Sequence, residues 1–437
     1  MTRVRHSGAS GSSRRFANRA LLAAAATGLS ALVAVVPAAA VPVTPTLGVP
    51  VAYAPGDVAD RADQVRDEQW QLDKLGAKVA WRTSTGRGVT VAVIDSGVDG
   101  SHPDLAGRVL PGIDLVSPGG TSEPDPVGHG TTVAGLIAGR NDDRQGVVGL
   151  APDARILPVR VLDEENRYDD ALIVAQGVRW AVDNGAQVIN LSLGGSGDSP
   201  ALAAAIDYAF ARDVVVVACT GNLATSPDAK VWYPAREPGV IAVSGLERAS
   251  NNLWSGAITG RATILTAPAS GLVGARPPSG YWRVQGTSFA APLVAATAAL
   301  VRSRYPKMSA GDVVNRLLVT AKDIGPTGRD DRFGYGLVDP IAALTADVPL
   351  VYQNPLDDND PPGISGFGPA PGSARGTAQD TEQLDLTGSQ QETRWRARAA
   401  GTPDDAASAR LWIGSLVLVA LLTSAALMVR RFRRAQR

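Results

Sequence analysis

Cysteine is almost absent from this 437-residue sequence, and so is an excess of either charge. The single cysteine, Cys219, excludes an intrachain disulfide, and its place in the apolar run VVVVAC favours a small core residue over a catalytic thiol. Lys and Arg together number 42, as do Asp and Glu, so the chain lacks the basic surplus that non-specific nucleic-acid binding requires. We therefore expect neither a disulfide nor a nucleic-acid partner.

Acidic residues are missing from the N-terminal region. Residues 1–20 contain five arginines and no Asp or Glu, and an apolar run from Leu21 to Val36 follows, ending in Pro-Ala-Ala-Ala. A basic stretch, an apolar stretch and small residues in this order are typical of a secretory signal peptide. The sequence therefore predicts a signal peptide over residues 1–40, cleaved after Ala40.

Charge is also missing from Leu411 to Val429, a run close to the ~20 residues that a helix needs to cross a bilayer. Four arginines follow at once, and such clusters stay on the cytoplasmic side of the membrane. A buried globular helix is the alternative, but it does not explain the basic cluster. We expect a transmembrane helix over 411–429, a cytoplasmic tail over 430–437, and a single-pass cell-membrane protein whose main domain is extracytoplasmic.

Between these ends the composition divides the chain into three parts. Residues 41–68 form a short N-terminal extension, and residues 69–346 have the composition of one large α/β domain. Residues 347–410 are rich in Pro, Gly, Asp and Ser, and they contain too little apolar surface to fold alone. This last part is expected to be a flexible linker between the domain and the membrane.

The α/β domain alternates short apolar runs with helical patterns. The helix expected between Asp169 and Asn184 has apolar residues at helical spacing and is closed by Gly185. Continuous apolarity in the strands is typical of a parallel sheet covered on both faces, so we predict a doubly wound, mostly parallel sheet with functional groups at the carboxyl ends of its strands. The expected strands span residues 89–94, 155–162, 187–193, 213–219 and 239–245.

Three polar residues stand where such a sheet exposes functional groups. Asp95 ends the first strand in VAVIDSGVDG, although Asp before Gly is also common in turns. His129 lies between two glycines at the start of an apolar helix, whereas His102, in the loop after Asp95, is expected to support that loop. Ser288 follows Gly286-Thr287 at the start of the apolar run SFAAPLVAATAAL.

These residues supply the roles of a nucleophilic triad. A serine needs a base to take its proton, and the base needs an acid that fixes its tautomer. Asp95, His129 and Ser288 provide acid, base and nucleophile in that chain order. Asn222, after the run VVVVACTG, is placed to donate to a developing oxyanion together with the backbone N–H of Ser288. The pattern predicts a serine endopeptidase.

The motifs DSGVDGSHPDL, GHGTTVAG, INLSLGG, GN and GTSFAAP together resemble the subtilisin-like serine proteases (peptidase S8) over Asp67 to Ala346. The resemblance implies a subtilisin-like three-layer fold. It also implies that Ser192, Leu193 and Gly194 pair with an extended polypeptide substrate and line the pocket for the residue before the cut. Departures at Thr132, Phe289 and Leu293 leave the triad complete but alter the pocket.

The short extension, the linker, the single span and the basic tip further resemble the mycosins, membrane-anchored proteases of type VII secretion systems. That resemblance implies a partner, the type VII secretion membrane complex. Two other functions fit the sequence: a scaffold that stabilises the secretion complex, and a general surface protease without a secretion partner. No recognisable ligand loop is present among the Asp residues, so we expect no metal ion and no cofactor.

Overall fold

The computed structural model describes residues 62–117, 124–143, 145–168, 170–225, 229–248, 250–351 and 353–357. These belong to one compact unit, Met1–Gly363; the second, Ile364–Arg437, lies outside the described residues. The expected signal peptide, most of the extension, the 411–429 span and the basic tail therefore lie outside them as well. Within the described part of the chain, no helix is both long and apolar enough to cross a bilayer.

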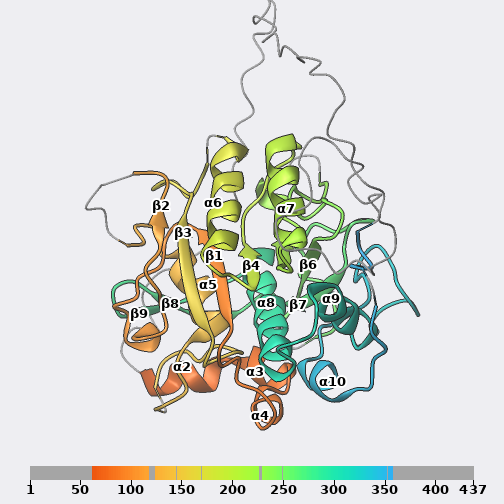
Figure 1. Cartoon of the computed structure of the whole chain (residues 1–437). Helices are drawn as coiled ribbons and strands as arrows, with labels where there is room; N and C mark the ends of the chain where they lie inside the picture. Colours follow the sequence, from red (N-terminus) through yellow and green to blue (C-terminus); the bar gives the residue numbers. More distant parts are fainter. Residues whose placement is uncertain are drawn as a thin grey trace, which may run out of the picture. The chain divides into compact units, whose positions relative to one another are not determined.

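Apolar strands form a parallel sheet of seven strands in the order β2-β3-β1-β4-β5-β6-β7 (Figure 1). Every neighbouring pair is parallel, as the continuous apolar runs predicted. All five expected strands are present; β2 and β7 are two that the sequence analysis missed. The strands are β1 (Thr90–Asp95), β2 (Ile113–Asp114), β3 (Arg155–Arg160), β4 (Val188–Leu191), β5 (Val215–Cys219), β6 (Ile241–Leu246) and β7 (Leu265–Pro268).

Two pairs of helices pack on this sheet. Helices α6 (Ala171–Asp183) and α7 (Pro200–Ala211) lie side by side and contact β1, β3 and β5 (Figure 1). Helices α5 (His129–Ala138) and α8 (Thr287–Arg304) contact each other and the sheet, with α8 crossing β4 to β7. Every residue of α8 from Thr287 to Arg302 is buried, because the helix is surrounded by the sheet and other helices. The three-layer α/β fold predicted from the sequence is thus present.

An antiparallel hairpin that the sequence analysis missed precedes α8. It consists of β8 (Leu272–Arg276) and β9 (Gly280–Val284), joined by Pro277 to Ser279. β8 packs on α5, and β9 leads within three residues into α8. The shorter elements are α2 (Ala62–Glu68), α3 (Trp70–Lys74), α4 (Ala77–Ala80), η1 (Pro103–Leu105), η2 (Leu223–Thr225), α9 (Ala310–Val319) and α10 (Pro340–Thr345).

Contacts of this unit continue past Ala346, where the sequence placed the start of the linker. The Asp312 carboxylate accepts a hydrogen bond from the Val351 N–H at 2.7 Å. Further along, Asn354 donates its amide to the Gly239 carbonyl at 2.8 Å, and the Leu356 carbonyl accepts from the Gly239 N–H at 2.8 Å. The first residues of the expected linker are therefore packed on the domain.

At the other end, α2 is fastened to the domain by Arg66. Its guanidinium donates to the carbonyls of Gly146 at 3.0 Å and Gln145 at 2.6 Å, and to Asn141 Oδ1 at 3.2 Å. Two longer bonds reach other carbonyls of the same turn. One cation thus satisfies several oxygens of the turn after α5, and it holds the end of the N-terminal extension against that turn.

Arg66→Ala is expected to lower the free energy of unfolding by about 2–4 kcal/mol, because charge-assisted hydrogen bonds of a largely buried side chain are lost and the carbonyls lose their donor. Urea unfolding of the purified protein measures the change. Lys78→Ala is the matched control, since its pairing with Asp73 at 4.0 Å joins two exposed side chains and contributes little. Equal free energies of unfolding for the two variants would contradict this stabilising role of Arg66.

Candidate active site

The expected site residues follow the carboxyl ends of three neighbouring strands. β1 ends at Asp95, the Ser192–Gly194 segment follows β4, and Asn222 follows β5 by three residues. Because β1, β4 and β5 are adjacent and parallel, these ends lie on one edge of the sheet. α5 and α8, which carry His129 and Ser288, begin at this edge and pack on each other.

Asp95 and His129 are brought together as a buried pair. The distance from His129 Nδ1 to Asp95 Oδ1 is 2.7 Å, and both side chains are excluded from solvent. A carboxylate only accepts, so Nδ1 carries the proton and Nε2 is left as the basic nitrogen. Gly130 permits this approach: a Cβ there would lie 2.0 Å from the Gly97 carbonyl oxygen and 3.2 Å from Asp95 Cβ.

The pKa of His129 is set by opposing effects. Burial disfavours the charged imidazolium and acts to lower the pKa. The Asp95 carboxylate, through its charge and its hydrogen bond, acts in the opposite direction, and the Asp125 carboxylate adds to it. The combined effect of the carboxylates exceeds that of burial, so the pKa of His129 lies above its usual value of 6.5. His129 is therefore a stronger base than an exposed histidine.

Ser288 lies in the first turn of α8, the end of a helix that favours an anion. Gly286 precedes this turn with a φ of 148°, a value that side-chain-bearing residues rarely adopt. The ring of Phe289 lies 5.2 Å from the His129 imidazole, centroid to centroid, so the next residue after Ser288 contacts the base directly. The first turn of α8 thus packs against the base.

The Ser288 hydroxyl points to Cys219 in this structure. Its Oγ donates to Cys219 Sγ at 3.9 Å, so this hydrogen bond must break before His129 can take the hydroxyl proton. Burial raises the pKa of the Cys219 thiol to about 11. The thiol is therefore neutral and a weak nucleophile, in line with its predicted role as a small buried residue.

Asn222 is oriented by Thr287, a residue that sequence reasoning missed. Asn222 Oδ1 accepts from the Thr287 N–H at 3.0 Å and contacts Thr287 Oγ1 at 3.1 Å. With Oδ1 fixed in this way, the Nδ2 donors face away from Thr287 and remain available to a ligand. The threonine of the GTS motif, immediately before Ser288, was the signal in the sequence that could have revealed this contact.

The expected substrate edge is built more from backbone than from side chains. Ser192 Oγ donates to the Ser288 carbonyl at 2.6 Å and is therefore used internally. Leu193 is completely buried, and its carbonyl accepts from Cys219 Sγ at 3.7 Å. Gly194 has no room for a side chain, because a Cβ would lie 2.6 Å from the Tyr233 carbonyl oxygen.

His102 lies apart from this group and supports its loop, as predicted. Its Nδ1 accepts from the Asp104 N–H at 3.2 Å, and its Nε2 lies 3.1 Å from the Gly280 carbonyl oxygen. The buried ring therefore joins the loop after β1 to the start of β9. Among the described residues, no group of His, Cys, Asp and Glu is arranged to hold a metal ion.

Asn222→Ala is expected to lower kcat about 10²–10³-fold with little change in KM, because an oxyanion donor acts mainly in the transition state and contributes about 3–4 kcal/mol. Steady-state kinetics on a peptide substrate measure both constants. Asn251→Ala, at an exposed position, is the matched control. A rise in KM with kcat unchanged would assign Asn222 to ground-state binding instead.

Known proteins share this arrangement of strands, helices and motifs. Residues 86–336 match the family model described as "Subtilase family", Peptidase_S8. Fervidolysin of Fervidobacterium pennivorans is 36% identical over 320 residues, which cover 66% of this chain and 45% of fervidolysin. The chain thus spans under half the length of that relative.

Among solved structures, the MycP3 protease from the type VII (ESX-3) secretion system aligns with a TM-score of 0.56 and 33% identity. The alignment covers 63% of this chain and 88% of MycP3. MycP1 aligns with the same TM-score at 32% identity, covering 64% of this chain and 98% of MycP1. The family match spans more than half of the sequence, and the chain therefore belongs to the subtilase family of serine endopeptidases.

Proposed function

We propose that this chain is a mycosin: a membrane-anchored, extracytoplasmic serine endopeptidase that acts with a type VII secretion system. The proteolytic function in this proposal rests on the buried Asp95–His129 hydrogen bond beside the first turn of α8. The similarity to MycP3, a protease of a type VII secretion system, supports the secretion part.

Hydrolysis uses Ser288 as the nucleophile. Its Oγ attacks the peptide carbonyl carbon while His129 Nε2 takes the hydroxyl proton, and Asp95 holds the imidazole by Nδ1 and stabilises its positive charge. The carbonyl oxygen becomes an oxyanion that accepts from Asn222 Nδ2 and the Ser288 N–H. His129 then gives its proton to the departing amine. The acyl group stays bound to Ser288 Oγ as an acyl-enzyme.

Water completes the cycle by the same groups. His129 Nε2 takes a proton from a water molecule, whose oxygen attacks the ester carbon of the acyl-enzyme. Collapse of the second oxyanion breaks the bond to Ser288 Oγ, which recovers the proton from His129. The substrate is an extended polypeptide whose backbone pairs with Leu193 and Gly194 as an added strand.

Anchoring rests on the sequence. A signal peptide over 1–40, a span over 411–429 and a basic tail over 430–437 place the protease domain outside the cytoplasmic membrane. Such an anchor keeps the active site close to the membrane complex from which substrates emerge. A protease acting freely on external proteins needs no such anchor, which favours a partner in the membrane.

The same anchor favours a second function, a scaffold that stabilises the secretion complex. Two variants in the producing cell separate the functions: Ser288→Ala removes the nucleophile, and deletion of 411–437 removes the anchor. Processing of a secreted substrate should stop in Ser288→Ala cells. Secretion that persists there but fails in the deletion strain supports the scaffold.

Affinity capture of tagged, full-length protein from solubilised membranes tests the partner. Co-purification of the secretion complex with wild type, and its loss on deletion of 411–437, is the expected result. Capture without any component of that complex, from membranes in which the complex is intact, overturns the type VII assignment and leaves a general surface protease.

A further inference from the structure

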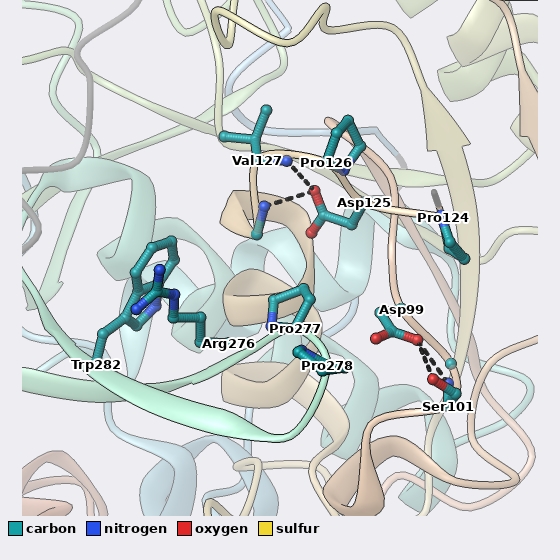
Figure 2. Close-up of a pocket in the computed structure, with 12 residues that line it drawn as sticks. Asp99, Ser101, Pro124, Asp125, Pro126, Val127, Arg276, Pro277, Pro278 and Trp282 are labelled. Atoms are coloured by element: carbon teal, nitrogen blue, oxygen red, sulfur yellow. Dashed lines mark hydrogen bonds between the residues drawn. The ribbon is translucent and has the colours of Figure 1, made fainter. Parts of the chain in front are cut away.

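A pocket of about 500 Å³ opens beside the loop that precedes His129 (Figure 2). Its wall includes Asp99, Asp125 and Gly128 from the loops after β1 and before α5, and Arg276, Pro277 and Trp282 from the β8–β9 hairpin. The sequence analysis did not predict this pocket, because the segments that form its wall are far apart in the chain. Each of these segments nonetheless lies close in the sequence to one of the triad candidates.

Each segment of the pocket wall is followed or preceded in the chain by a triad candidate. Asp99 follows Asp95 by four residues, Gly128 is joined to His129, and Trp282 lies six residues before Ser288. Asp125 links two of the walls, since its carboxylate accepts from Ser96 Oγ and the Gly128 N–H, each at 2.8 Å. The pocket is therefore built from the segments of the chain that carry the three triad candidates.

The hairpin wall is held rigidly. Trp282 Nε1 donates to Thr132 Oγ1 at 2.6 Å, so the indole is fixed on α5. A Cβ on Gly128 would lie 3.1 Å from both Pro277 and the indole, which shows how closely the two walls approach at this point. A pocket built from prolines and a fixed indole loses little entropy when it binds a side chain.

Asp99 is a nearly buried carboxylate in the wall of this pocket. It is only 5% exposed, and its Oδ1 accepts from the Ser101 N–H at 2.9 Å and Ser101 Oγ at 2.6 Å. Its other oxygen is turned away from Ser101, toward the Pro277–Pro278 side (Figure 2), and within the described residues no cation pairs with it. A buried carboxylate in this state gains strongly from a positive partner.

The other two charges of the wall are already accommodated. Asp125 accepts from the Ser96 and Thr131 hydroxyls and from the backbone N–H groups of Gly128 and Thr131. The Arg276 guanidinium is partly exposed and lies 5.3 Å from the Trp282 ring centroid, where it stacks on the indole. Water screens the charge of Arg276 more than that of Asp99. Asp99 therefore has the larger effect on which charged side chain the pocket binds.

The lining of the pocket points to the leaving-group side of the site. His129 protonates the departing amine, so the released part of the substrate begins at His129, and Gly128 adjoins it. The acylated part pairs instead with the segment after β4, beyond Asp95 on the sheet edge. We propose that this pocket binds a Lys or Arg side chain within the first three residues after the scissile bond, with its cation on Asp99. This inference rests on the proposed proteolytic function.

Internally quenched peptides test the proposal on the full-length, detergent-solubilised protein. Their sequence before the scissile bond is constant, and Lys, norleucine or Glu stands at each of the three positions after it. We expect kcat/KM to be about tenfold higher for Lys than for norleucine at one position, as for a close charge pair. Asp99→Asn should reduce this ratio to near one, and the matched control Asp73→Asn, at an exposed position, should preserve it.

Arg276→Gln provides a second, independent measurement, because removing the opposing cation should raise the Lys-to-norleucine ratio about threefold or more. A Lys-to-norleucine ratio that stays constant in both variants overturns the proposal, and so does a wild-type preference for Glu over Lys at all three positions after the scissile bond. If Asp99→Asn fails to fold by circular dichroism, the Arg276→Gln ratio decides.

The proposed function has its own readout, a peptide p-nitroanilide that has no residue after the scissile bond. If the wild-type protein hydrolyses this substrate but cleaves all quenched peptides at equal rates, the proposed role of the pocket is wrong and the proteolytic function stands. Absence of hydrolysis of every substrate by folded protein rejects the proteolytic function itself.

Discussion

Ser288→Ala is expected to lower kcat by about 10⁶-fold, the loss typical of removing the nucleophile from a serine triad. The buried His129 and Asp95 remain in place, but neither can form the acyl-enzyme. The residual rate comes from substrate binding and the oxyanion donors. Wild-type protein should also react stoichiometrically with a fluorophosphonate probe, whereas the variant should not, and intact mass spectrometry measures this adduct.

The matched control is Ser250→Ala, because the Ser250 hydroxyl accepts a hydrogen bond from the N–H of Asn252, two residues along the same bend. It should retain both activity and labelling. Cys219, the hydrogen-bond partner of Ser288, offers an internal check: its buried, neutral thiol is a poor nucleophile, so it does not replace the missing hydroxyl. Labelling of a folded Ser288→Ala protein would place the nucleophile elsewhere.

Much of the central sheet was predictable because its cause is local. Runs such as VVVVAC and QVINLSL are apolar on both faces, and only a strand covered on both sides by helices buries them completely. The expected ends of β1 and β5 then place Asp95 and Asn222 on one edge. β2 has only two residues and β7 contains a proline, so neither carries enough pattern to be recognised.

The supporting contacts were missed, since they join residues that are far apart in the chain. The bond from Thr287 to Asn222 spans 65 positions, and the bond from Ser96 to Asp125 spans 29. Asp125 illustrates the point: its sequence context, DPV, is typical of a turn. In the structure burial raises its pKa, and its charge adds to the basicity of His129. Such roles depend on which loops the fold brings together.

The second large effect concerns the base and its acid. Asp95→Asn is expected to lower kcat about 10⁴-fold, because the asparagine amide donates to Nδ1 and leaves the proton on Nε2, where the base is needed. Geometry is preserved, since the amide has the shape of the carboxylate. The loss therefore measures the tautomer and the charge, and substrate binding should change little.

The pH profile separates these causes. In wild type the raised pKa of His129 keeps the imidazole protonated to a pH above 6.5, so kcat/KM should rise with pH through that higher value. Asp95→Asn removes the main charge that raises the pKa, while burial, which lowers it, persists. The acid limb of the residual activity should move to lower pH, and Asp73→Asn should leave it in place. An unmoved limb in Asp95→Asn would mean that the titrating group is not His129, because the bond of 2.7 Å makes Asp95 the strongest influence favouring its charged form.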